Sequence, residues 1–129
     1  MKFFIPLVSF LSLAMTAFAA TPSIAEISQA DLQAAVASKS AVLLDANGTD
    51  SYAAGHIPGA IDFTAHRDEL AKLLPADKSA LIVAYCANVH CPAYRLAADA
   101  ALSLGYTNVR HFAPGIEGWK ESGAPTEKN

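Results

Sequence analysis

Apolar residues in this chain fall into short runs separated by segments of mixed character. AVLLDA (41–46) and ALIVAY (80–85) are apolar on successive positions, which is typical of strands buried on both faces. TNVRHF (107–112) is more polar, and we interpret it as a third strand. Each run is long enough for a strand and too short for a buried helix. The pattern therefore predicts three strands, each set between segments of another kind.

The segments between these runs carry apolar residues at helical spacing. They predict four helices, at residues 30–38, 66–74, 91–104 and 115–122. Ser28 followed by Asp31 resembles a capping box before the first helix, and Pro92 and Gly105 suit the first turn and the C-terminal cap of the third. Residues 47–60 contain three glycines and a proline, so we expect mostly turn and loop there.

Strands that alternate with helices indicate a central parallel sheet flanked by helices, an α/β fold. In such sheets ligands bind beyond the carboxyl ends of the strands, in loops that lead into helices. The stretch CANVHC (86–91) occupies that place, between the strand at 80–85 and the helix that follows. This position makes it a candidate site before its chemistry is considered.

The first residues have the features of an export signal. Lys2 precedes an apolar stretch, FFIPLVSFLSLAM (3–15), and Ala17-Phe18-Ala19 fits the rule for a cleavage site. We expect a signal peptide at residues 1–19, an exported periplasmic or secreted protein, and one domain at 20–129. An uncleaved N-terminal anchor is the alternative, although the apolar stretch is short for a membrane span.

The net charge of the chain is −3 at pH 7, with no cluster of lysine or arginine. This balance argues against nucleic acid as a partner and against stable association with an anionic membrane. Two cysteines are too few for a disulfide scaffold, so the domain must fold mainly on its apolar core. In an oxidising compartment the same two thiols can pair.

The loop CANVHC ends at a predicted helix N-terminus, where unpaired backbone N–H groups and the helix dipole favour an anion. A cysteine in that position is partly thiolate, so Cys86 is a candidate nucleophile or persulfide carrier. Asn88 and His90 have polar side chains that add to the cradle. The alternative from strand position alone is a buried structural cysteine.

Two other chemistries fit this loop less well. A metal site at Cys86, His90 and Cys91 lacks the usual Cys-x-x-Cys spacing and a clear fourth ligand, so we expect no metal and no cofactor. We interpret His90 as a loop residue rather than a general base, because the sequence names no carboxylate partner for it.

Three segments resemble, in order and spacing, the signatures of single-domain rhodanese-like proteins. They are LLDANGTDSYAAGHIPGAI (43–61), LIVAYC (81–86) and GYTNVRHFAPGIEGWKESGAP (105–125). The GHIPGA, strand-ending YC and GIEGW elements together make the resemblance specific, and it extends over a core of about 28–125. It implies a three-layer sulfurtransferase fold.

The resemblance also implies roles for the loop. Cys86 is the expected catalytic residue, which carries a sulfane sulfur as a persulfide. The cradle for the persulfide and the incoming anion is the substrate-binding loop of Ala87, Asn88, Val89, His90 and Cys91. The implied reaction is ping-pong: sulfur comes from thiosulfate, another small sulfur-containing anion or a protein persulfide, and passes to a thiol acceptor. Asp45, His56 and Trp119 match positions that we interpret as structural.

The chain also departs from the family pattern. Cys91 and Pro92 stand where many members have arginine or lysine followed by serine or threonine, and Asn47 stands where an arginine is usual. Arg95 is a possible auxiliary cation. The missing loop cation weakens binding of a dianion such as thiosulfate, and it disfavours phosphatase or arsenate-reduction chemistry.

Two functions remain open from the sequence. In the first, the protein is an exported sulfurtransferase or sulfane-sulfur carrier, with Cys91 as a resolving or regulatory thiol. In the second, it is a redox-sensitive interaction module, in which Cys86 and Cys91 cycle between dithiol and disulfide without significant transferase turnover.

Overall fold

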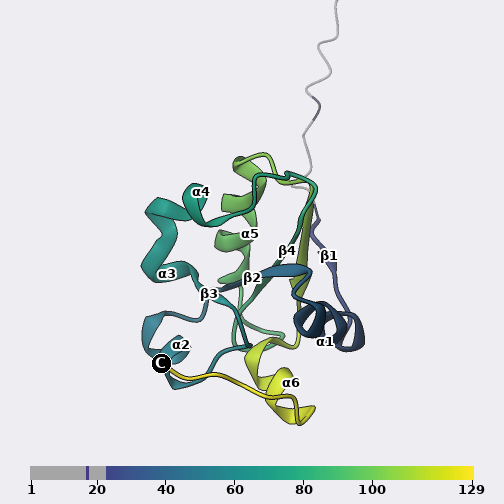
Figure 1. Cartoon of the computed structure of the whole chain (residues 1–129), viewed down its shortest axis with the longest axis vertical. Coiled ribbons are helices and arrows are strands. Elements are labelled where there is room, and N and C mark those ends of the chain that lie inside the picture. The colour runs from purple at the N-terminus through teal and green to yellow at the C-terminus, as the bar shows by residue number, and fades with distance from the viewer. Residues whose placement is uncertain (1–16, 18–22) are drawn as a thin grey trace, which may run out of the picture.

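A computed structural model describes residue 17 and residues 23–129 (Figure 1). The predicted signal peptide at 1–19 therefore lies outside the described residues, apart from Ala17. In the part that the structure describes, no helix combines the length and the apolar character needed to cross a membrane.

The described chain forms one parallel sheet of five strands. The strands are β1 (Ala25–Glu26), β2 (Ala41–Asp45), β3 (Ile61–Asp62), β4 (Leu81–Tyr85) and β5 (Asn108–Phe112). Their order across the sheet is β1-β5-β4-β2-β3, and every pairing is parallel. The predicted α/β fold with a central parallel sheet is therefore confirmed.

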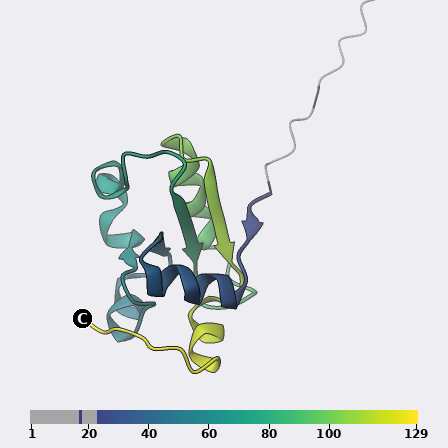
Figure 2. The same ribbon diagram turned by 45° about the vertical axis from the view of Figure 1, so that its right-hand side comes forward.

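Helices cover both faces of this sheet, which gives three layers (Figures 1 and 2). The helical elements are α1 (Gln29–Ser38), α2 (Thr49–Ala54), α3 (Phe63–His66), the 3₁₀ turn η1 (Arg67–Glu69), α4 (Leu70–Leu73), α5 (Tyr94–Ser103) and α6 (Gly115–Glu121). Leu44 and Ile82 belong to a core cluster with residues of α3, α4 and α5, whereas Leu43 and Val83 pack with residues of α1 and α6. Neighbouring strand residues thus point to opposite faces, and both faces are buried, as the continuously apolar runs predicted.

The structure corrects two predictions about the helices before β4. Residues 47–60 are not only turn and loop, because the short helix α2 lies within them between Gly48 and Gly55. The single helix expected at 66–74 is instead α3, η1 and α4. The Asp62 side chain caps the backbone N–H of Ala65, so the first of these begins three residues early.

The third predicted helix begins later than expected. It starts at Tyr94 rather than at residue 91, so Pro92 precedes the helix instead of lying in its first turn. The N–H groups of Arg95 and Leu96 bond to the carbonyl groups of Pro92 and Ala93, three residues back, as in a tight turn. The chain enters a regular helix only after this turn, which follows the disulfide between Cys91 and Cys86.

The carboxyl ends of the three central strands lie side by side. The register pairs Asp45 of β2 with Tyr85 of β4, and Tyr85 with Phe112 of β5. The residues after these strand ends therefore meet at one edge of the sheet, and Cys86 is among them.

Candidate active site

Cys86 follows the last residue of β4 and is only 3% exposed. Its backbone is fixed by helix α6, which approaches from the C-terminal part of the chain. The N–H of Ile116 donates to the carbonyl of Cys86 (2.9 Å), and the N–H of Glu117 donates to the carbonyl of Ala87 (3.0 Å). The first N–H groups of a helix have no partner within it, and here they hold the start of the loop.

Gly115 makes this close approach possible. Its φ of +64° lies in the left-handed region. A Cβ at this position would lie 2.5 Å from the carbonyl oxygen of Cys86 and 2.6 Å from that of Ala87. Because both neighbours are backbone atoms, neither can move aside cheaply, and only glycine fits. The first glycine of GIEGW is therefore required by the contact with the cysteine loop.

A buried chain of hydrogen bonds lies beneath Cys86. The fully buried Asp45 accepts at Oδ2 from the hydroxyl of Tyr85 (2.8 Å) and at Oδ1 from the N–H of Asn47 (2.8 Å). The Tyr85 oxygen accepts in turn from the N–H of Ile57 (3.1 Å). Burial raises the pKa of Asp45, and the hydrogen bonds from Asn47 and Tyr85 oppose this rise. Asp45 thus orders the neighbouring loops, as its position in the sequence led us to expect.

The side chain of Asn47 extends from this group of residues toward the sulfur of Cys86. The Oδ1 atom of Asn47 lies 3.7 Å from Cys86 Sγ. Asn47 is half-buried and follows β2, so it reaches Cys86 across the ends of two neighbouring strands. The first two signature segments are thereby joined through Asp45, Asn47 and Tyr85.

Cys86 and Cys91 form a disulfide, with their Cα atoms 6.0 Å apart. This separation lies within the range of ordinary disulfides. Cys86 is buried whereas Cys91 is half-buried, so Cys91 is the more accessible partner. Of the dithiol and disulfide forms that the sequence left open, the structure holds the disulfide.

The residues between the two cysteines are held mainly by local bonds. The Asn88 side chain accepts from the N–H of His90 (2.9 Å), and the Asn88 carbonyl accepts from the N–H of Cys91 (3.2 Å). One longer-range bond runs from Asn88 Nδ2 to Glu117 Oε2 (3.2 Å). Val89 is 67% exposed. Asn88, Val89 and His90 therefore lie close to Cys91, as a loop of this length requires.

A cavity of about 310 Å³ lies between this loop and α6. It is lined by Asn88, Val89, His90, Pro114, Glu117, Gly118 and Glu121. Its charged lining residues are two glutamates, with no lysine or arginine among the residues that line it. The cavity thus provides no cation for a sulfur-containing dianion.

Arg95 and His90 differ in their surroundings. Arg95 lies in the first turn of α5, where its Nε pairs with Asp99 Oδ1 (3.0 Å) four residues further along. Its auxiliary role stays a prediction. His90 is exposed in the loop. Among residues 17 and 23–129, no group of three or more histidine, cysteine or acidic residues is placed to hold a metal ion.

His56 and Trp119 have structural surroundings. The buried His56 ring stacks on Tyr52 and lies 2.8 Å from the Tyr52 carbonyl oxygen through Nδ1. The Trp119 indole donates to the carbonyl of Pro125 (2.7 Å) and packs edge-on against Phe112. Both residues therefore fix the segments around the sheet, as we interpreted them from the sequence.

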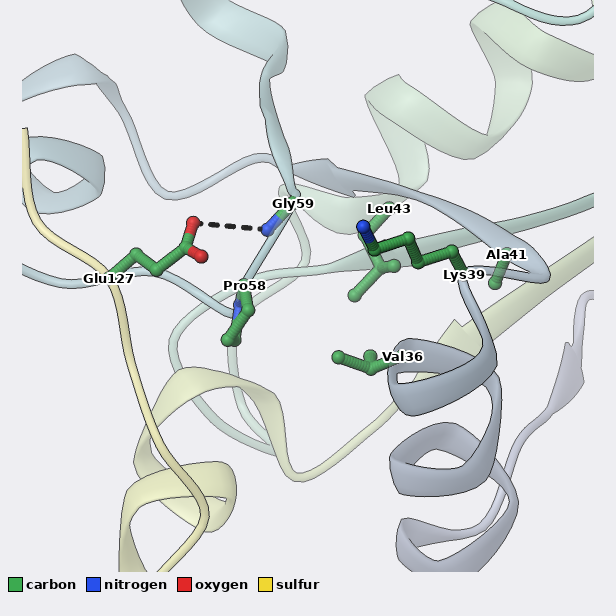
Figure 3. Close-up of a pocket in the computed structure, with 7 residues that line it drawn as sticks. All are labelled: Val36, Lys39, Ala41, Leu43, Pro58, Gly59 and Glu127. Carbon is green, nitrogen blue, oxygen red and sulfur yellow. Dashed lines mark hydrogen bonds between the residues drawn. The ribbon is translucent and has the colours of Figure 1, made fainter.

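A second cavity, of about 430 Å³, lies near the end of α1 (Figure 3). It is lined by Val36, Lys39, Ala41, Leu43, Pro58, Gly59 and Glu127. The Glu127 carboxylate accepts from the N–H of Gly59, and Lys39 extends its amine from the other side of the cavity (Figure 3). No residue of the cysteine loop lines it, so it is separate from the candidate site.

Sequence reasoning named Cys86 and its loop but did not assign Gly115, Tyr85 or Asn47 to the site. Their contacts join residues far apart in the chain, such as Asn47 and Cys86, 39 positions apart. The available signal was the match of all three signature segments, since each of these residues lies within one of them. The result is a buried cysteine whose backbone is held by α6 and whose sulfur is bonded to that of Cys91.

Comparisons with known proteins agree with this architecture. A family model described as a rhodanese-like domain matches residues 28–122. The chain resembles a rhodanese-related protein from Thermoplasma volcanium, with a TM-score of 0.62 and 23% identity over 81% of this chain and 99% of that chain. No curated protein matches.

Two further solved structures are described as sulfurtransferases. Thiosulfate sulfurtransferase from Pseudomonas aeruginosa is 25% identical with a TM-score of 0.63, over 81% of this chain and 20% of that chain. The human single-domain sulfurtransferase TSTD1 is 26% identical with a TM-score of 0.57, over 77% of this chain and 97% of that chain. The family match spans well over half of the sequence, and the chain therefore belongs to the rhodanese-like domain family.

Proposed function

We propose that this protein is a sulfurtransferase or sulfane-sulfur carrier, in which Cys86 takes up the sulfur and Cys91 is the resolving thiol. The observation that supports this most is the place of Cys86. It directly follows the central strand β4, its backbone is fixed by the N–H groups of α6, and its sulfur is bonded to that of Cys91. The names of the two sulfurtransferases of similar structure point to the same chemistry.

The reaction begins with the reduced form. The Cys86 thiolate attacks the outer sulfur of a donor such as thiosulfate, and the sulfur–sulfur bond of the donor breaks. Sulfite leaves with the electron pair, and Cys86 carries the outer sulfur as a persulfide. A protein persulfide as donor reacts in the same way and leaves as a thiolate.

Two outcomes are then open to the persulfide. An acceptor thiolate can attack the outer sulfur and carry it away, which returns Cys86 as a thiolate. Alternatively, the Cys91 thiolate attacks Sγ of Cys86, the bond to the outer sulfur breaks, and hydrosulfide leaves. This second step oxidises the two cysteines by two electrons to the observed disulfide and reduces the transferred sulfur to sulfide.

The same disulfide supports a second candidate, a redox-responsive module without significant sulfur transfer. In that case Cys86 and Cys91 exchange only between dithiol and disulfide, and the fold serves to bind a partner. We keep sulfur transfer as the principal proposal, because two of the solved structures that this chain resembles are described as sulfurtransferases.

We also propose that the protein acts in the periplasm or outside the cell, which rests on the signal-like residues 1–19. An oxidising compartment favours the disulfide at rest. Each cycle that ends in the disulfide then needs an external dithiol to regenerate Cys86.

Mass spectrometry of the persulfide tests the principal proposal. Protein reduced and freed of reductant is incubated with thiosulfate or with a polysulfide. The Cys91→Ser variant is expected to gain the mass of one sulfur atom, which cyanide removes, and Cys86→Ser to gain none. Uptake by Cys86→Ser but not by Cys91→Ser would reverse the roles of the two thiols. If neither wild type nor Cys91→Ser takes up sulfur from either donor, although the thiols are free at the start, sulfur transfer is rejected and the redox module is the remaining function.

A further inference from the structure

We propose that the side-chain amide of Asn47 stabilises the anionic sulfur of Cys86, as thiolate and as persulfide. The inference rests on the proposed role of Cys86 and names a second group in contact with its reacting atom. Asn47 stands where the resemblance to the family leads one to expect an arginine. The structure places its polar end beside the nucleophile, with Oδ1 3.7 Å from Cys86 Sγ.

The chemistry of the two groups decides which amide atom faces the anion. A thiolate or persulfide has no proton and only accepts hydrogen bonds, so the amide must present its NH₂ group. The oxygen and nitrogen of an asparagine amide exchange places by a half turn of χ2. Nδ2 then takes the position of Oδ1, at a distance suited to a hydrogen bond to sulfur, without any movement of the backbone.

The backbone of Asn47 is already fixed for this role. Its N–H donates to Asp45 Oδ1 (2.8 Å), and Asp45 is itself fully buried and bonded to the Tyr85 hydroxyl. Little motion of the backbone is therefore lost when the amide binds sulfur, so most of the hydrogen bond contributes to stabilising the anion.

The charged groups around the loop increase the importance of the Asn47 amide as a hydrogen-bond donor to the Cys86 sulfur. Asp45 lies beneath the loop, Glu117 contacts it from α6, and both are acidic. An amide donor lowers the free energy of a singly charged sulfur without adding a formal charge. It therefore suits a persulfide or a monoanionic donor better than the thiosulfate dianion, which gains most from a cation.

The Cys86 thiol pKa measures this contact directly. In a Cys91→Ser background, the rate of alkylation by iodoacetamide is measured from about pH 5 to about pH 10, which gives the apparent pKa of Cys86. Asn47→Asp replaces the donor by a carboxylate of the same shape. We expect it to raise the thiol pKa by about one unit or more, a tenfold loss of thiolate at neutral pH.

Asn108→Asp is the matched control, with the same change of charge. Asn108 begins β5 opposite Leu81, at the other end of the sheet from Cys86, and we expect it to leave the thiol pKa unchanged. Asn47→Ala keeps the N–H bonded to Asp45 and removes only the amide. It is expected to raise the Cys86 pKa by a smaller amount than Asn47→Asp does. It replaces the aspartate variant in the test if that variant does not fold.

The outcomes separate this inference from the proposed function. If Asn47→Ala leaves the Cys86 pKa at the wild-type value, or if Asn47→Asp and Asn108→Asp shift it equally, the inference is wrong. Persulfide mass is measured on the same samples. If substitution of Asn47 shifts the Cys86 pKa but no sulfur is taken up, the contact between Asn47 and Cys86 is supported and sulfur transfer is rejected. If sulfur is taken up but the pKa does not respond to Asn47, sulfur transfer is supported and the contact is rejected.

Discussion

The two halves of the cysteine loop are held in different ways. The loop base, Cys86 and Ala87, is fixed by hydrogen bonds from residues far away in the chain, Ile116 and Glu117 of α6. The loop tip, residues 88–92, is fixed mostly by bonds between its own members, together with the disulfide. The base is buried at Cys86, whereas the tip is exposed at Val89.

This difference matches two different demands. A sulfur that accepts a substrate atom must keep one position, and long-range bonds to a packed helix provide this. A thiol that resolves the intermediate must approach and later release its partner, which a locally held segment does at lower free-energy cost. We infer that the base sets reactivity and the tip sets the redox state.

The largest effect is expected from breaking the base at Gly115. Gly115→Ala introduces a Cβ against the backbone of Cys86 and Ala87 at a positive φ, and we expect a loss of about 2–4 kcal/mol in the free energy of unfolding. Gly123→Ala is the control, because Gly123 also has a positive φ but has open space around its Cβ. It is expected to cost about 1–2 kcal/mol. Urea unfolding measures the loss in both variants. Equal losses would show that the contact of Gly115 with Cys86 and Ala87 adds nothing to the cost of the positive φ.

A smaller loss is expected from the hydrogen-bond chain beneath the base. Tyr85→Phe leaves the buried Asp45 carboxylate and the N–H of Ile57 each without one partner, at a cost of about 1–3 kcal/mol. Tyr52→Phe removes a hydroxyl that bonds only to the carbonyl of Ala60 in a half-buried place, and about 1 kcal/mol is expected. Thermal unfolding compares the two, and a greater loss in Tyr52→Phe would contradict the importance of the buried chain.

The tip is expected to tolerate change. Asn88→Ala removes an exposed local bond to His90 and one bond to Glu117, so the loss should stay below about 1 kcal/mol. The disulfide should be reduced faster by a small thiol, because the tip is less restrained. A loss as large as that of Gly115→Ala would show that the tip is part of the same rigid unit as the base.

The smallest expected effect is a dependence of stability on pH, caused by His111 near the start of α5. The His111 ring stacks on Tyr94, and burial lowers the pKa of His111 below its usual value of 6.5. The stability linked to His111 is therefore complete above about pH 6.5 and is lost as the pH falls through the pKa of the folded state. His111→Phe keeps a ring without titration.

Wild type should consequently lose more unfolding free energy than His111→Phe between about pH 7.5 and about pH 5. Chemical unfolding at the two pH values measures the difference. Equal losses in the two proteins would show that His111 titrates alike in the folded and unfolded states.

Strands β2 and β4 could be predicted because each is a continuous apolar run, as expected of strands buried on both faces. Strands β2, β4 and β5 all lie within one residue of the expected ranges. Strands β1 and β3 have two residues each, too few for any period to appear. The helix at 66–74 is predicted as one element, whereas the charged residues Arg67–Glu69 form a 3₁₀ turn that divides α3 from α4.

The site could be predicted less fully than the sheet. The position of Cys86 follows from the end of a strand, which a local pattern reveals. The contacts of Asn47, Tyr85 and Gly115 with the loop or its support depend on how segments 28 to 40 positions apart meet, which no local pattern contains. The disulfide was an open alternative, because only the path of the loop brings the two cysteines within reach.

The release of sulfite and sulfide tests the division between base and tip most directly. Fully reduced protein is mixed with excess thiosulfate without oxygen, and sulfite, sulfide and free thiols are counted. The account predicts one sulfite and one sulfide per wild-type molecule with loss of both thiols. For Cys91→Ser it predicts one sulfite and no sulfide, with the persulfide retained. Equal sulfide release from Cys91→Ser and wild type, or no sulfite from either, would contradict a base that takes up sulfur and a tip that resolves it.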